Sequence, residues 1–270
     1  MTADPRPFEY RQIWQQKPVL RRLYERYYRD IARRCRPGRT LEIGGGSGNL
    51  KGFLGDIVST DRLFGPWLDA VADAGALPFA AASFDNIVLF DVLHHLSAPG
   101  RFLAEAERVL CLGGRLILIE PAITPVSGLF YRVFHPEPVI MTTDPLAEAA
   151  PGRDPWEANQ AIPTLLFGRH RRSFEAACPG LLLVELRRFA LASYPLSGGF
   201  RRWSLLPASL VDPLCTIEHW LEPVLGRLMA FRLLAVLERI GWGGPEGAAQ
   251  NQAEDDRQDE GTDGPLEQEE

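Results

Sequence analysis

The stretch Leu41–Leu50, LEIGGGSGNL, decides the fold of this chain. It places four glycines within five consecutive residues, directly behind a short apolar run. A glycine inside a regular element costs roughly 0.5–1 kcal/mol relative to alanine, so such a bare turn needs a reason. In an open parallel sheet, the first strand-to-helix turn lets a ligand approach the backbone closely. We expect the next helix to begin near Ser47 to Asn49, with its free N–H groups available to an anionic group.

The segment around this turn, residues 40–121, alternates short apolar runs with helical stretches. This alternation predicts an α/β fold with a doubly wound, mostly parallel sheet. The runs typical of strands are TLEIG (40–44), IVSTD (57–61), AVAD (70–73), FDNIVLF (84–90) and GRLILIE (114–120). Residues 99–114 have apolar residues at helical spacing and end on two glycines, which are a typical helix stop.

The rest of the chain has a different character. Residues 1–39 predict an N-terminal helical segment, and the proline-rich residues 121–171 predict a lid, an inserted cap or poorly ordered chain. RSFEAAC (172–178) predicts a helix, LLLVELRRFAL (181–191) a sixth strand, and residues 210–240 one or two closing helices. We therefore expect four regions: an N-terminal segment (1–39), a core (40–121), a mostly helical lid and acceptor region with a closing strand (122–242), and a tail (243–270).

Charge is spread unevenly along the chain. Residues 243–270 hold ten acids and one base, a net charge of −9, whereas the whole chain carries −6. This tail has almost no large apolar residue, so we expect it to be disordered. The first forty residues hold eleven bases and four acids. Their basic helix either packs through an apolar stripe that includes Leu20, Leu23 and Tyr27, or contacts anionic lipid or nucleic acid.

Cysteine usage and hydropathy restrict the compartment. The four cysteines lie far apart and form no C-x-x-C pair, which speaks against a disulfide framework and against a zinc cluster. The N-terminus lacks the apolar core of a signal peptide, and no uncharged apolar run reaches the ~20 residues that span a bilayer. We expect a soluble, cytoplasmic protein, with a peripheral membrane contact of the C-terminal segment left open. The oligomeric state has no sequence signal.

Spacing within the glycine turn distinguishes two classes of ligand. A dinucleotide fingerprint beginning at Gly44 would need glycine at position 49, where the chain has asparagine. The turn fits acid-x-G-x-G-x-G instead, with Glu42, Gly44, Gly46 and Gly48. This pattern resembles the first motif of class I methyltransferases that depend on S-adenosylmethionine (SAM).

Downstream residues extend the resemblance. Asp61 ends the second predicted strand nineteen positions after Glu42, near the spacing of an acid that binds a ribose diol, although a turn cap is an equal alternative. Residues 71–121 are similar to the methyltransferase run D-x-x-x-LPF, SFD, L-x-H-L, RVL and GG. The resemblance covers about residues 40–121, and it implies a Rossmann-like fold and SAM as cofactor. The cofactor-binding residues that it implies are Glu42, Gly44, Gly45, Gly46, Gly48, Asp61, Asp73, Ala74, Phe90 and Asp91, with Asp73 and Ala74 facing the adenine.

Three histidines are candidates for catalysis. His94 and His95 follow the fourth predicted strand, and His135 lies in the predicted lid; each could deprotonate an acceptor, and each could equally be structural. Glu120 and Asp91 end strands, where an acid orients the acceptor or caps a turn. We expect no metal, because adjacent side chains on an extended segment point to opposite faces and no acid or cysteine nearby completes a ligand set.

The sequence therefore favours a SAM-dependent methyltransferase that acts on a small molecule, such as a lipid or saccharide intermediate. A first alternative is a scaffold or regulatory protein that keeps the fold without the activity. A second alternative, a nucleic-acid methyltransferase, draws on the basic N-terminus, but the acidic tail would repel a phosphate backbone. We expect no nucleic-acid partner.

Overall fold

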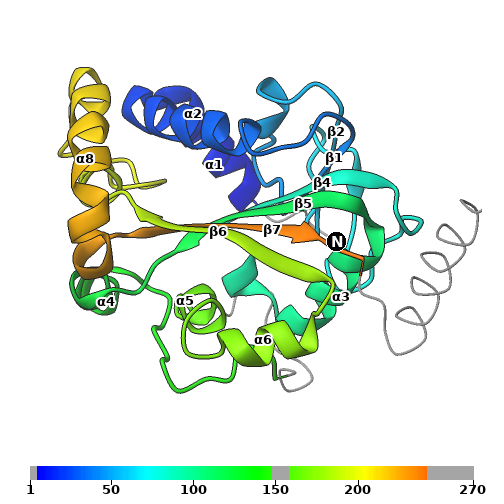
Figure 1. Ribbon diagram of the computed structural model, residues 1–270. Helices are drawn as coiled ribbons and strands as arrows, with labels where there is room; N and C mark the ends of the chain where they lie inside the picture. The colour runs from blue at the N-terminus through cyan, green and yellow to red at the C-terminus, as the bar shows by residue number, and fades with distance from the viewer. Residues whose placement is uncertain (1–4, 148–157, 242–270) are drawn as a thin grey trace, which may run out of the picture.

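A computed structural model describes residues 5–147 and 158–241, and it places a seven-stranded sheet at the centre of the molecule (Figure 1). The predicted tail at 243–270 lies outside the described residues. The strand order is β3-β2-β1-β4-β5-β7-β6, and every strand except β7 runs in the same direction. The strands are β1 (Thr40–Ile43), β2 (Ile57–Asp61), β3 (Ala70–Val71), β4 (Phe84–Phe90), β5 (Leu110–Pro121), β6 (Leu181–Phe189) and β7 (Arg232–Arg239). The predicted α/β, mostly parallel sheet is confirmed.

Helices cover both faces of this sheet. One face carries α1 (Arg6–Gln16) and α2 (Pro18–Ala32), and the other carries α3 (Pro99–Val109), α5 (Ile162–Leu166) and α6 (Arg171–Ala177). The helices α4 (Pro125–Phe134) and α8 (Val211–Met229) stand at one end of the sheet in Figure 1, and the short α7 (Ser193–Ser197) precedes α8. Three single 3-10 turns complete the fold: η1 (Leu50–Gly52), η2 (Leu93–His95) and η3 (Ala208–Leu210).

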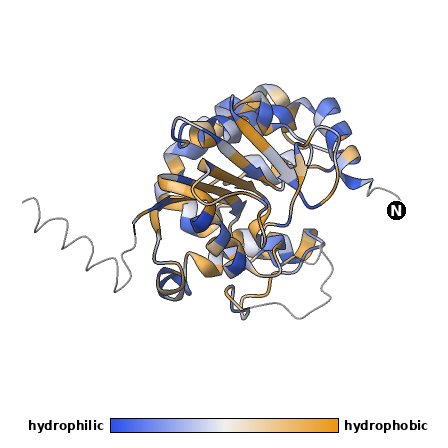
Figure 2. Cartoon of the chain, turned by 90° about the vertical axis from the view of Figure 1, so that its right-hand side faces the viewer, coloured by the Kyte–Doolittle hydropathy of each residue, from blue (hydrophilic) through white to orange (hydrophobic). Residues whose placement is uncertain are grey.

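The core consists of two layers because successive strand residues point to opposite faces. Ile87 and Leu89 of β4 pack against α3 and α5, whereas Val88 between them packs against α2. Strand β7 alternates in the same way, and Figure 2 shows how much of the sheet is hydrophobic. Helix α2 buries the predicted stripe of Leu20, Leu23 and Tyr27, so the basic helix is a packed, amphipathic element.

The N-terminal half of the sheet has fewer helices than predicted. The glycine turn leads into the 3-10 turn η1, and the described residues between β1 and β4 contain no α-helix. The helix expected near Ser47 to Asn49 is therefore wrong, and with it the proposed anion site at a helix N-terminus. Four closely spaced glycines make helix initiation unfavourable here.

Two further boundaries differ from the sequence prediction. Helix α3 ends at Val109 and β5 begins at Leu110, so the helix does not extend to the glycine pair. Residues 232–239 form strand β7 and not the end of a closing helix. They pair antiparallel with β5 on one side and with β6 on the other. The region after residue 121 therefore completes the same sheet that the core begins.

Candidate functional site

One large cavity lies at the carboxyl ends of β1, β2, β4 and β5. The antiparallel strand β7 begins at the same edge of the sheet. The cavity has a volume of about 1590 Å³. It is lined by all of the predicted cofactor residues except Gly48, and by all three predicted histidines. Helix α4, the loop after it and the segment around Phe200 form the opposite wall. Ligand pockets of ~300–1,000 Å³ are usual, so this cavity has room for two ligands side by side.

The glycine turn forms the floor of one end of the cavity. Gly44, Gly46 and Gly48 have positive φ angles of 71°, 46° and 71°, which side chains rarely adopt. A Cβ on Gly44 would lie 2.2 Å from Cγ2 of Val92, and a Cβ on Gly48 would lie 2.5 Å from the Trp67 ring. A Cβ on Gly46, in contrast, would have no atom nearer than 3.9 Å. Packing explains the first two glycines, whereas Gly46 leaves open space toward the cavity.

Asp61 holds the turn and borders the cavity at the same time. Its Oδ2 accepts a hydrogen bond of 2.9 Å from the Gly46 amide, and its Oδ1 accepts one of 2.9 Å from the Leu63 amide. The cap expected as an alternative is therefore present. A carboxylate offers about four acceptor positions, so these two bonds leave capacity for a bound hydroxyl group.

Glu42 lies under the same turn and is almost fully buried. Its carboxylate accepts a hydrogen bond from the Ser59 hydroxyl. Burial raises the pKa of Glu42 to about 7, although the bond from Ser59 opposes this shift. Asp73, on the next loop, accepts a 2.8 Å hydrogen bond from the Gly75 amide, and Ala74 beside it lines the cavity.

An ion pair between a buried arginine and a half-buried aspartate also lines this cavity. Asp91 follows β4 with a φ of 57°, and Arg232, the first residue of β7, pairs with both of its carboxylate oxygens. The guanidinium carbon of Arg232 lies 3.8 Å from the centre of the Tyr194 ring, and its Nη2 donates to the Tyr24 hydroxyl at 3.3 Å. Arg232 is 1% exposed, and within the described residues its Nε has no hydrogen-bond partner.

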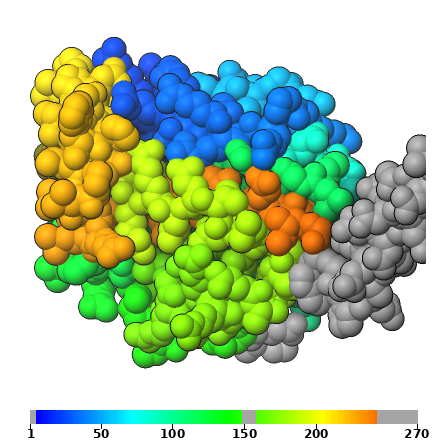
Figure 3. Space-filling model, viewed as in Figure 1, coloured from blue at the N-terminus to red at the C-terminus, as the bar shows by residue number. Residues whose placement is uncertain are grey.

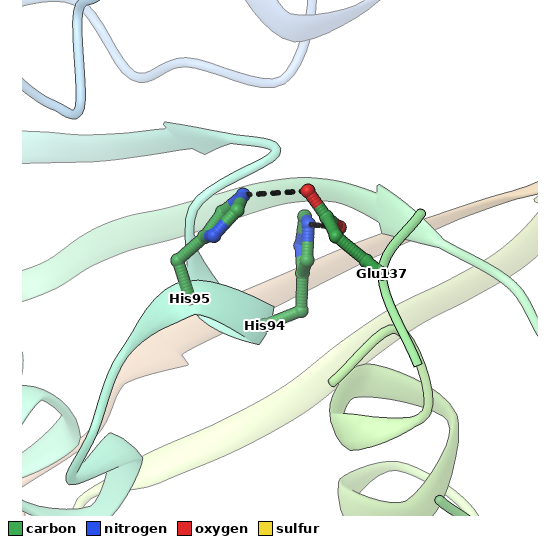
Figure 4. A group of neighbouring side chains, drawn as sticks. All are labelled: His94, His95 and Glu137. Carbon is green, nitrogen blue, oxygen red and sulfur yellow. Dashed lines mark ion pairs between the residues drawn. The ribbon is translucent and has the colours of Figure 1, made fainter. Parts of the chain in front are cut away.

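His94 and His95 lie beside Glu137, an acid of the segment predicted as a lid (Figure 4), and His135 lies near the same acid. Nε2 of His94 lies 3.6 Å from Oε2 of Glu137, and Nε2 of His95 lies 3.9 Å from its Oε1. Nδ1 of His135 is 4.0 Å from Oε2 of the same carboxylate. The loop after α4 therefore reaches the turn after β4 through one acid.

His94 is held from behind by Glu120, the acid near the end of β5. Oε2 of Glu120 lies 2.6 Å from Nδ1 of His94, and its Oε1 accepts hydrogen bonds of 2.8 Å from the amides of Val92 and Leu93. Glu120 is fully buried and caps the turn η2, so it does not reach the cavity as an acceptor-orienting acid. Its role is to fix His94.

The two adjacent histidines have different protonation states because different groups face their rings. Burial by itself would lower the pKa of His94, but Glu120 and Glu137 outweigh it and raise the pKa to about 10. Burial and the neighbouring His94 charge lower the pKa of His95 to about 4. Burial also lowers the pKa of His135. At neutral pH His94 is an imidazolium, and His95 and His135 are neutral.

Glu137 remains ionised among these groups. Burial alone would raise its pKa, but the bond to His94 and the nearby histidines lower it to about 2.

The two reasons given above for expecting no metal were wrong. The His94 and His95 rings lie on one 3-10 turn with centroids 4.2 Å apart, and Glu137 is an acid beside both. The Glu137 carboxylate faces the His94 ring, with Oε2 of Glu137 3.6 Å from Nε2 of His94.

Sequence reasoning missed Glu137, Arg232 and the tyrosines beside Arg232. Glu137 stands between two prolines in a segment without periodicity, and Arg232 was placed on a helix. The apolar run after Arg232, read as a buried strand, was the signal that could have located it, because β7 starts where the parallel strands end.

Comparisons with known proteins agree with this geometry. Residues 41–118 match the family model described as a methyltransferase domain. A demethylmenaquinone methyltransferase of Thermus thermophilus is 30% identical over 129 residues, which are 39% of this chain and 58% of the relative. The ubiquinone/menaquinone biosynthesis C-methyltransferase UbiE of Bordetella parapertussis is 36% identical over 107 residues, 32% of this chain and 42% of the relative. The chain thus spans about half the length of these curated relatives.

A solved structure shows the same fold over more of the chain. A SAM-dependent methyltransferase of Thermotoga maritima, described as a possible histamine N-methyltransferase, is 16% identical and has a TM-score of 0.50. The match covers 87% of this chain and 100% of that one. Residues 41–118 therefore match a methyltransferase domain, the fold around them is Rossmann-like, and the match implies SAM as the cofactor.

The residues at the glycine end of the cavity fit this cofactor. The open space over Gly46 accommodates a group that lies directly on the backbone, and Asp61 keeps acceptor capacity beside it. Gly44 to Gly46 and Asp61 would hold the amino-acid and ribose parts, and Asp73 with Ala74 would face the adenine. These roles remain predictions. The cavity residues from α4 and around Phe200, at the opposite end, would then be available to a second ligand.

Proposed function

We propose that this chain is a SAM-dependent methyltransferase that transfers a methyl group to a small, largely apolar acceptor of the quinone or lipid kind. The observation that carries the proposal is the continuity of one cavity from the glycine turn to a chamber walled by aromatic side chains. The chamber residues are Tyr24, Phe130, Tyr131, Phe134, Tyr194, Phe200 and Trp203. The names of the two curated relatives, which concern menaquinone and ubiquinone biosynthesis, support an acceptor of this chemical class.

Methyl transfer needs alignment more than it needs a base. The cofactor supplies an electrophilic methyl group bound to a sulfonium. Orientation of two reactants in one site is worth roughly 7–11 kcal/mol, and a positioned base adds about 10²–10⁴-fold. The protein contributes a cavity whose two ends meet at the Asp91–Arg232 pair, so this pair borders the place where acceptor and cofactor would touch.

His95 is the histidine that we assign to proton removal. It is neutral at physiological pH, and a quarter of its side chain (24%) is exposed in the cavity. His94 already carries its proton and is buried, so it positions His95 and Glu137 instead. Arg232 lines the cavity beside the place where acceptor and cofactor would touch, and its guanidinium charge would stabilise negative charge on an acceptor oxygen.

Calorimetric titration with SAM and with its demethylated product, S-adenosylhomocysteine, tests the cofactor half of the proposal. We expect micromolar binding of both and no binding of NAD. Removing the hydrogen bonds to a carboxylate costs ~1.5–3 kcal/mol, so Asp61→Ala should weaken SAM binding about tenfold or more. Gly46→Arg should abolish binding, because the new side chain would occupy the space over the turn.

Gly113→Arg is the matched control. Gly113 also has a positive φ, of 71°, and open space around its Cβ position, but it does not line this cavity, so its arginine should leave SAM affinity unchanged. Equal affinity of the Gly46→Arg and Gly113→Arg proteins would show that the cofactor binds elsewhere. Absence of SAM binding in the unmodified protein would overturn the proposal.

A further inference from the structure

Helix α8 exposes its apolar stripe to solvent. Ile217, Trp220, Leu221, Val224 and Leu228 recur at the spacing of one helical face, and each of them is exposed. Trp220 and Val224 are each 78% exposed. A surface helix of a soluble protein normally turns such a stripe toward the core. Figure 1 shows α8 along one edge of the molecule, and Figure 3 shows its outer side forming the surface at that edge.

Helix α4 repeats this inverted arrangement beside α8. Its buried residues include Ser127 and Gly128, whereas Val126, Leu129 and Val133 are exposed. The two helices contact each other. Arg201 donates a 2.7 Å hydrogen bond to the carbonyl of Phe134, the last residue of α4, and so joins the loop that bears Trp203 and Leu205. We call the exposed apolar side chains of α8 and α4, with Trp203 and Leu205, the apolar face.

The acids of α8 are turned away from the apolar face or are already paired. Glu218 is buried and accepts hydrogen bonds from the amides of Ala192 and Ser193 and from the Ser193 hydroxyl. Glu222 pairs with Arg187, and Asp212, at the start of the helix, pairs with Arg22 and Arg26. Two acids of the helix are thus paired with arginines and the third is buried, while its apolar residues face outward.

The bases near the apolar face are exposed. Arg132 of α4, Arg227 of α8 and Arg202 of the loop all lie in solvent, and within the described residues none of them forms an ion pair. Burial and the charge of Arg227 lower the pKa of Arg188, so a second cation lies near Arg227. An apolar stripe rimmed by arginines is the pattern of a helix that lies in the interface of an anionic bilayer.

We infer that the apolar face is a membrane-docking surface that inserts into the interface of a bilayer containing anionic lipid. Charge decides between this occupant and a second copy of the chain. A two-fold interface would bring the arginines of one copy toward those of the other, whereas anionic headgroups match them. No described helix is long and apolar enough to cross a membrane, so the contact would be peripheral.

The apolar face also borders the entrance of the cavity. Phe134, Trp203 and Leu205 are exposed on the apolar face, and they line the cavity as well. An apolar acceptor dissolved in the bilayer would therefore reach the acceptor chamber from the docked side. This last step rests on the proposed function, whereas the docking itself does not.

Vesicle sedimentation of the full-length protein tests the inference. The unmodified chain should bind vesicles of phosphatidylglycerol and phosphatidylcholine, and it should bind pure phosphatidylcholine vesicles far less. The double variant Trp220→Glu/Val224→Glu should lose about tenfold or more in vesicle affinity, and so should Arg132→Glu/Arg227→Glu. Leu112→Glu is the matched control, because Leu112 is 69% exposed on β5 and lies outside the apolar face.

Three outcomes would overturn the inference: no binding to anionic vesicles, equal loss of binding in the Leu112→Glu control, or a stable dimer that the Trp220→Glu/Val224→Glu change dissociates. Light scattering of the same samples reads the last outcome. SAM titration of each variant separates this inference from the proposed function. Protein that binds SAM but no vesicles contradicts the docking alone, and protein that binds vesicles but no SAM contradicts the proposed function alone.

Discussion

Single residues decide which histidine of the site can accept a proton. His94 is buried between Glu120 and Glu137, so its imidazolium is stabilised, whereas its positive charge suppresses protonation of His95. Two adjacent residues of one type therefore hold different protonation states. The difference arises from which carboxylate faces each ring, and both carboxylates come from other elements of the fold.

The buried charge of His94 gives the stability of the protein a defined pH dependence. The folded pKa of His94 is raised from 6.5 to about 10, so its stabilisation is fully present below pH 6.5 and is lost as the pH rises toward 10. We expect the free energy of unfolding of the unmodified protein to fall over this window more steeply than that of His94→Gln. Urea unfolding at several pH values measures both slopes, and equal slopes would contradict the assignment.

Proton removal by His95 has a kinetic signature. His95→Gln should lower the transfer of labelled methyl groups from SAM to a lipid-extractable fraction by about 10²–10⁴-fold, with SAM affinity unchanged. The pKa of His95 is about 4, so the unmodified rate should show no rise attributable to this group between pH 6 and 8. His219→Gln, which changes an exposed histidine on α8, serves as the control. A rate loss as large in the control would remove His95 from the mechanism.

Sequence spacing located the site residues near the glycine turn, but it did not locate the site residues that lie far from this turn in the sequence. Glu42, Asp61 and Asp91 stand at strand ends, and the ends of parallel strands meet at one edge, so their meeting could be foreseen. Glu137 and Arg232 reach the same cavity from a loop and from a late strand. No local pattern encodes those distances, because tertiary packing sets them.

At the scale of elements, the sequence pattern predicts the wrong secondary structure for β7, a helix in place of a strand. Its residues are apolar on both sides because both faces of the sheet are covered, and such a run does not differ by periodicity from a buried helix. Its ladder to β5 extends from Arg115 opposite Glu238 to Pro121 opposite Arg232. After β1 the error was the opposite one, since a helix was expected near Ser47 to Asn49 and the chain forms only the 3-10 turn η1 there.

Strand β7 should be a major source of stability. Leu237→Ala removes a fully buried side chain and should cost about 2–5 kcal/mol of unfolding free energy. Leu182→Ala makes the same change on the neighbouring strand β6, where the side chain is 51% exposed, and should cost well under half as much. Urea denaturation compares the two variants. Similar losses would mean that β7 is less tightly packed than its burial indicates.

For the whole molecule, the cavity couples ligand binding to folding. The loop after α4, the glycine turn and β7 all contribute residues to this cavity. A ligand that fills the cavity should therefore stabilise both layers of the core together. SAM at about one hundred times its dissociation constant should add about 2.7 kcal/mol to the free energy of unfolding. The Gly46→Arg protein should gain nothing under the same conditions. Thermal unfolding followed by fluorescence and by circular dichroism measures the gain, and a gain confined to one probe would argue against a shared cavity.

The place of β7 in the sheet has a consequence for synthesis of the chain on the ribosome. Residues 232–239 enter between β5 and β6, which have both been translated long before. Until β7 has been synthesised, β5 has an unpaired edge and Asp91 lacks its partner Arg232. Most of the chain has then been translated, but the site is still incomplete. A translation arrest shortly before residue 232 would therefore yield a chain that depends on chaperones.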